Sequence, residues 1–163
     1  MRTVFLIVHV ASGVVALVLG PLALLAAWRQ LPSFGRLRDA YHWTVLAVCA
    51  TATVVSVLDW ARLWWLVPIA ALSYGLALAG YLGSRRHWPL WMRAHGWGGS
   101  YIALVTALLV VSARGVSGVL EAVAWILPAA IGVPLIVRAH TGPHRRPGHH
   151  ARIAMPDRPS RSP

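Results

Sequence analysis

Histidines at the ends of apolar segments are the residues of this sequence that could do chemistry. His42 and His95 each begin an apolar run, and His140 directly follows the last run. A neutral imidazole is a good ligand for haem iron, and two imidazoles that face each other from adjacent helices form a low-spin redox site. We therefore take His42 and His95 as candidate ligands of haem b, because they lie at equivalent depth, and His140 as a further candidate on the same side.

Two other interpretations of these histidines stay open. Interfacial histidines can hydrogen-bond to the backbone or to lipid phosphate without binding a cofactor or taking part in a reaction, and we favour this interpretation. A bound metal or a quinone-type ligand is the third, since ionisable groups inside membranes commonly serve a function. No Cys-x-x-Cys-His attachment motif is present, and no cysteine or carboxylate cluster accompanies the tail histidines, so we assign no metal ligands.

His9 and Glu121 are the polar side chains on the opposite side of the predicted bundle. In a straight helix His9 lies roughly 27 Å from the far end of its apolar run, so it cannot share a ligand with His42 or His95. If the first and last runs pack together, the Glu121 carboxylate would orient the His9 ring. We prefer the simpler interpretation that Glu121 lies in the first turn of a helix, at the positive end of the dipole.

The composition requires membrane helices to position these side chains. Of the 163 residues, 58% are hydrophobic and only 12% are charged, which departs strongly from an ordinary soluble domain. The apolar residues come in blocks long enough to cross a hydrocarbon layer. We expect an all-α integral membrane protein, a bundle of five transmembrane helices with spans at about 4–27, 41–58, 63–82, 94–113 and 119–137. The first run is longer than the apolar region of a signal peptide, which favours an uncleaved span.

The arginines predict the orientation of the bundle. All fifteen basic residues are arginine, and most lie in the loops at 28–40 and 83–93 and in the tail at 138–163. The positive-inside rule places these segments in the cytoplasm and the N-terminus outside. The tail is too polar to fold alone, so we expect it to be disordered and to bind anionic lipid. Because the arginines flank apolar blocks, we do not expect nucleic acid as a partner.

Small residues recur along one face of several predicted spans. His9 is followed at helical spacing by Gly13, Ala16 and Gly20, and His95 is followed by Gly99, Ala103 and Ala107. Such stripes let helix backbones approach closely, so we expect these histidines and His42 to point inward. Cys49 has no partner for an intrachain disulfide and is expected to be a packed core residue.

Several short motifs resemble an uncharacterised bacterial family of small multi-span inner-membrane proteins, a domain of unknown function. They are the His9-x-x-x-Gly13 start, Gly20-Pro21, and the helix entry His95-Gly-x-Gly-Gly-Ser-Tyr101, over roughly residues 4–137. The resemblance implies a protein of the bacterial cytoplasmic membrane and supplies no catalytic residues.

The motifs of common hydrolases and nucleotide-binding enzymes are absent from the sequence, so we lean against an enzyme. We expect a structural or accessory membrane protein, with a second copy or another membrane protein as its partner. One alternative is a b-type haem redox protein with bis-histidine ligation. Another is a small transporter whose last helix breaks at Pro128 and Pro134, although the scarcity of intramembrane charge argues against it.

Overall fold

The computed structural model describes residues 2–86, 88–113 and 118–141, and these residues form helices without any strand. Five helices are long and apolar enough to cross a membrane. They are α1 (Arg2–Trp28), α2 (Phe34–Leu58), α4 (Leu66–Arg85), α5 (Leu90–Ala113) and α6 (Gly118–Thr141), with the short helix α3 (Trp60–Leu63) between α2 and α4. The predicted all-helical bundle with five candidate spans is confirmed at this level.

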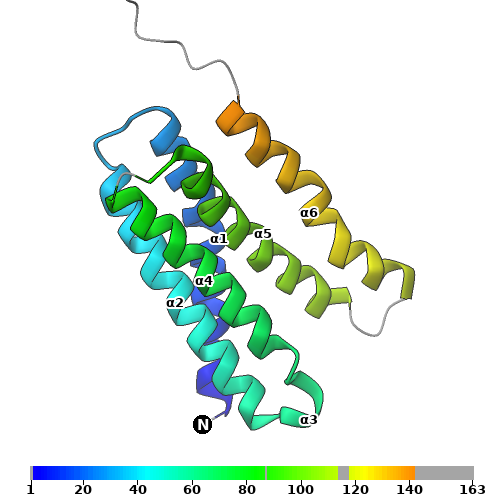
Figure 1. Ribbon diagram of the computed structural model, residues 1–163. Helices are drawn as coiled ribbons and strands as arrows, with labels where there is room; N and C mark the ends of the chain where they lie inside the picture. The colour runs from blue at the N-terminus through cyan, green and yellow to red at the C-terminus, as the bar shows by residue number, and fades with distance from the viewer. Residues whose placement is uncertain (1, 87, 114–117, 142–163) are drawn as a thin grey trace, which may run out of the picture.

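Consecutive long helices run in opposite directions, and α6 lies at the outside of the bundle beside α5 (Figure 1). Helix α2 packs against α1 and α4, α5 packs against α4 and α6, and α1 also touches α5. The ends of α1, α4 and α6 therefore meet the beginnings of α2 and α5 at one end of the bundle. We call this the arginine-rich end, because it carries Arg29, Arg36, Arg38, Arg85, Arg86, Arg93 and Arg138.

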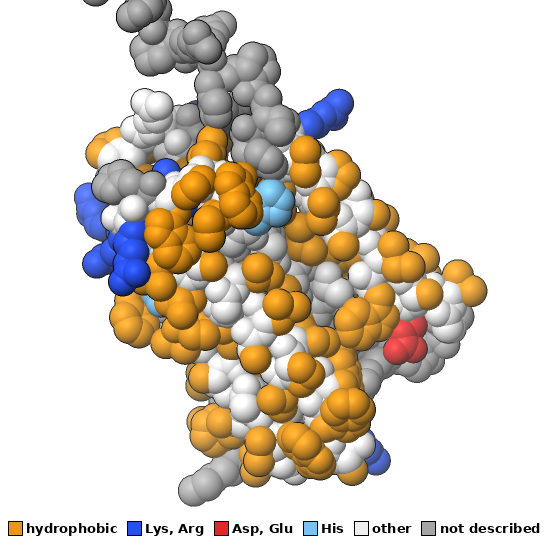
Figure 2. Space-filling view, viewed as in Figure 1, with side chains coloured by type: hydrophobic (Ala, Val, Ile, Leu, Met, Phe, Trp, Pro, Cys, Tyr) orange, Lys and Arg blue, Asp and Glu red, His pale blue; other side chains and the backbone are white. Residues whose placement is uncertain are grey.

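The surface separates apolar and charged side chains along the length of the bundle. In Figure 2 hydrophobic side chains cover the middle of the helices, while arginine side chains appear near the ends. Helices α1 and α6 are the most exposed of the five, with few residues buried inside the bundle. Such an apolar surface suits a lipid environment, where every backbone polar group must be satisfied within its own helix.

Four of the long helices extend further than the predicted spans, and α4 is shifted toward the C-terminus by three residues. Helix α2 begins at Phe34, so Arg36, Arg38 and Asp39 lie in its first turns and not in a loop. Helix α4 runs from Leu66 to Arg85. Charge marks where the hydrocarbon layer ends, but a backbone still gains from internal hydrogen bonds beyond that level. The sequence pattern therefore identified the five long helices but not their exact ends.

Two predictions concerned the C-terminal part of the chain. Helix α6 continues through both Pro128 and Pro134, so the helix breaks expected for a transporter are not present. It also extends to Thr141, so residues 138–141 of the predicted tail are helical. The rest of the predicted disordered tail lies outside the described residues.

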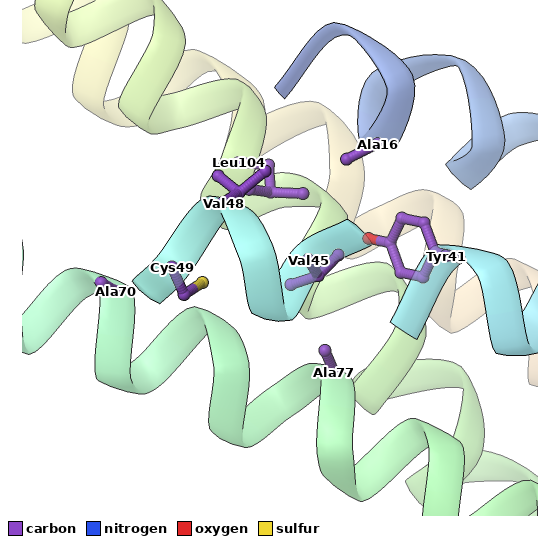
Figure 3. Close-up of a cluster of buried hydrophobic side chains, with 8 residues drawn as sticks. All are labelled: Ala16, Tyr41, Val45, Val48, Cys49, Ala70, Ala77 and Leu104. Carbon is purple, nitrogen blue, oxygen red and sulfur yellow. The ribbon is translucent and has the colours of Figure 1, made fainter. Parts of the chain in front are cut away.

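The core of the bundle is built around α2. Figure 3 shows Tyr41, Val45, Val48 and Cys49 of α2 directed at small or branched side chains of the neighbouring helices. Those neighbours are Ala16 of α1, Ala70 and Ala77 of α4, and Leu104 of α5. Cys49 is a buried core residue, as predicted. The central position of α2 places Tyr41 and His42 between the other helices.

Candidate functional site

His42 lies buried between α2 and α4, with only 5% of its surface exposed. Its imidazole stacks on the ring of Tyr81, with centroids 4.2 Å apart and planes 14° from parallel. The Nδ1 atom is buried and has no hydrogen-bond partner within the described part of the chain. The inward orientation predicted for His42 is confirmed, and its neighbour is an aromatic ring of α4.

Two arginines approach the same tyrosine. The guanidinium carbons of Arg38 and Arg85 lie 5.4 and 5.0 Å from the centroid of Tyr81, within cation–π distance. Both also pair with Asp39: Arg38 Nη2 lies 2.8 Å from Oδ1, and Arg85 Nη2 lies 3.6 Å from Oδ2. We call Arg38, Asp39, His42, Tyr81 and Arg85 the Tyr81 cluster. It joins α2 to α4 at the arginine-rich end.

His95 lies on the surface of α5, which corrects the prediction that it points inward. Its Nδ1 atom donates to the backbone oxygen of Trp91, one turn earlier, at 2.7 Å. The buried face of α5 is displaced by one residue from the expected stripe and contains Gly96, Ser100 and Leu104. The reason is steric: a Cβ at Gly96 would lie against the backbone of Gly80, so this glycine allows α5 to approach the backbone of α4 closely.

Tyr41 connects α2 to α5 across the centre of the bundle. Its hydroxyl lies 3.0 Å from Ser100 Oγ, and Ser100 donates its own proton to the Trp97 carbonyl. Tyr41 is therefore the donor in the first bond. Its ring also stacks on Trp97, with centroids 5.2 Å apart. The space between α2 and α5 at the level of His42 is thus filled by aromatic side chains.

Two further hydrogen bonds join neighbouring helices. Tyr101 of α5 donates to the Leu17 carbonyl of α1 at 3.3 Å, and Trp97 donates to Ser84 of α4 at 3.1 Å. The Tyr101 ring occupies the space that a side chain at Gly20 would need. This contact supports the predicted close approach along the small-residue face of α1.

His9 points inward, as predicted, and it contacts α2. Its Nδ1 atom lies 3.2 Å from the Val48 carbonyl and 3.1 Å from Thr51 Oγ1. Because a carbonyl only accepts, Nδ1 carries the proton. Thr51 lies nine residues beyond His42 on α2, roughly 13.5 Å along a helix axis. His9 and His42 therefore lie at different depths, as the sequence indicated.

The remaining candidates are separate from these contacts. Glu121 lies in the first turn of α6, where the dipole interpretation placed it, while the bonds of His9 go to α2. His140 lies in the last turn of α6, and its side chain is outside the described part of the structure. Among the described residues, no three His, Cys, Asp or Glu side chains are arranged to hold a metal ion.

The structure therefore does not give His42 and His95 a common environment. One ring is stacked beneath Tyr81 and buried, and the other is exposed on α5 beside Trp91. Their pairing as haem ligands stays a prediction. Comparisons with protein-family models, with curated proteins and with solved structures find no match to this chain.

Sequence reasoning missed the partners of His42. Arg38 and His42 are four residues apart on α2, and Tyr81 and Arg85 are four residues apart on α4. This spacing places each pair on one helix face, which is a signal that the sequence carried. That the two faces meet follows only from the packing of α2 against α4.

Proposed function

We propose that this chain is a structural or accessory protein of the membrane and not an enzyme. The observation that supports the proposal is that polar side chains inside the bundle form hydrogen bonds between helices. Tyr41 bonds to Ser100, His9 to Thr51, and Trp97 to Ser84, each across two helices. In apolar surroundings such bonds hold helices together, and here they engage polar side chains that a catalytic site would leave open to substrate.

The apolar outer faces of α1 and α6 are consistent with this role. Both helices pack on the bundle along one face and expose the other, so lipid or another membrane helix can cover them. We further propose that the arginine-rich end lies in the cytoplasm of a bacterial cell, with the N-terminus outside, because arginine retains a segment on that side.

Native mass spectrometry of the protein released directly from membranes tests the proposal. We expect the chain with bound lipid, and a second copy or a membrane partner in a fixed ratio. A non-lipid small molecule bound in a fixed ratio to the chain would contradict a purely structural or accessory role. If replacing one histidine removes that molecule while the fold is kept, the histidine is part of a binding site and the proposal is wrong.

Bis-histidine haem ligation is the second candidate function. It is favoured by the buried Nδ1 atom of His42, which has no partner among the described residues. It is also favoured by His95, whose Nδ1–H bond to a backbone carbonyl fixes the ring tautomer in the way seen for many metal-bound histidines. Against it, the stack of Tyr41 on Trp97 occupies the space between α2 and α5. We therefore rank it below the accessory role.

A further inference from the structure

We propose that the Tyr81 cluster binds the phosphate headgroup of an anionic phospholipid. The first observation is a surplus of hydrogen-bond donors. A guanidinium carries more N–H donors than a single carboxylate can accept, and Arg38 and Arg85 share one carboxylate, that of Asp39. Arg38 uses its Nε and Nη2 atoms on Asp39, while Arg85 reaches it only at 3.6 Å. Phosphate oxygens would accept from the donors that remain.

The second observation is the position of the cluster. Arg85 is the last residue of α4, and Arg38 lies in the second turn of α2, where the apolar segments give way to charge. One turn further into the apolar segment, Trp43 is 63% exposed and lies edge-on to His42, with centroids 5.5 Å apart. Indole rings prefer the membrane–water interface. The cluster therefore lies at headgroup level, with an aromatic side chain beneath it for the glycerol region.

The third observation is that the cations are held in place before any ligand arrives. The imidazole of His42 stacks on Tyr81 and fixes the ring to which both guanidiniums are attracted. The Arg38 side chain is only 16% exposed and is paired with its neighbour Asp39. Because the arginines come from two helices, a phosphate that contacts both would also hold α2 against α4.

Charge selects an anionic lipid over a neutral one. Among the described residues of the arginine-rich end, Asp39 is the acidic side chain, against seven arginines. Each arginine near an anionic surface contributes about 1 kcal/mol, which corresponds to about fivefold in affinity. A zwitterionic lipid offers the same phosphate but adds a cation that these arginines repel.

The test is a titration of the detergent-purified full chain, followed by native mass spectrometry. The probes are dioleoyl phosphatidylglycerol, dioleoyl phosphatidylcholine and inorganic phosphate. We expect phosphatidylglycerol to bind more tightly than phosphatidylcholine. We expect Arg85→Gln to weaken the binding of phosphatidylglycerol about fivefold. Arg85 is 54% exposed, so we expect its replacement to leave the fold intact. Arg38→Lys keeps the charge but removes the planar fork, and we expect it to weaken binding as well.

Arg86→Gln is the matched control, since Arg86 is the exposed neighbour of Arg85 and makes no contact with Tyr81 or Asp39. An equal loss from Arg86→Gln would overturn the site in favour of general attraction to a basic surface. Equal binding of the two lipids would overturn the selectivity. Displacement of the lipid by inorganic phosphate at similar concentration would identify free phosphate as the ligand and overturn the lipid assignment.

Discussion

Gly96 of α5 lies directly against the backbone of Gly80 of α4, and Trp97 fills the space beside the same glycine. A side chain at Gly96 would meet backbone atoms, which cannot rotate away. This contact sets the rotation of α5, so that Ser100 faces the bundle centre and His95 faces outward. The orientations of Ser100 and His95 thus depend on the contact between Gly96 and Gly80.

Replacing Gly96 by valine is expected to push α5 away from α4. Overpacking of this kind typically costs about 1–3 kcal/mol, and here the backbone of Gly80 prevents a cheap adjustment. Thermal unfolding in detergent measures the loss. Gly75→Val is the control, because within the described part of the chain nothing lies within 4 Å of a side chain at Gly75. Equal destabilisation by both variants would show that helix propensity, and not the crossing, is responsible.

Helices α5 and α6 fit together through a reciprocal pattern. Ile136 of α6 occupies the space at Gly98, and Ile102 of α5 occupies the space at Gly132. Both helices therefore carry a glycine followed four residues later by an isoleucine, and antiparallel packing places each isoleucine on the partner's glycine. We expect Gly98→Leu to loosen α6 from α5.

The loosening can be measured by the reaction of a cysteine with a membrane-permeant maleimide. Ala124 is 6% exposed on α6, and Ala124→Cys in a Cys49→Ala background should react slowly. Adding Gly98→Leu should increase the rate several-fold. Gly118→Leu should not, because no atom of the described residues lies within 4 Å of a side chain there. An unchanged rate with Gly98→Leu would refute the interlocking of the two helices.

The bond between Tyr41 and Ser100 should contribute measurably to stability. Double-mutant cycles of interhelical hydrogen bonds in a membrane protein average about 0.6 kcal/mol, with a maximum near 1.7. We expect a coupling of about that size between Tyr41→Phe and Ser100→Ala in the free energy of unfolding. If the effects of the two substitutions on the free energy of unfolding are additive, the Tyr41–Ser100 bond does not stabilise the packing of α2 against α5.

The orientation of the chain can be tested with a reporter fused after Pro163. With the arginine-rich end in the cytoplasm, a reporter that works only in the cytoplasm should be active, and one that requires export should be silent. The same reporters inserted after Arg62, in the short helix α3 at the opposite end of the bundle, should give the reverse pattern. Activity of the exported reporter after Pro163 would invert the proposed topology.

Sequence alone was enough to predict the five long helices, because apolar blocks that could cross a hydrocarbon layer are separated by charged segments. It did not predict the short helix α3. It also gave the inward direction of His9 and His42, which share helix faces with small or packed residues. It failed for His95, since two overlapping small-residue stripes begin at His95 and Gly96 and differ by one residue. Only the fit of Gly96 against Gly80 selects between them.

The Tyr81 cluster could not be predicted from the sequence for a similar reason. Helical spacing places Arg38 with His42 and Tyr81 with Arg85, but each pair alone is compatible with an ordinary interfacial face. The contact between them depends on the relative height and rotation of α2 and α4. These are set by small core residues such as Ala70 and Ala77, which carry no chemical signal of their own.

The absorption spectrum of the protein, purified in detergent from haem-replete cells and recorded oxidised and reduced, tests the central claim most directly. If the interior polar groups serve helix packing, the spectrum has no Soret band, and His42→Ala or His95→Ala alters stability alone. A Soret band that disappears with either replacement, and survives His9→Ala, would contradict the accessory role and establish a haem protein.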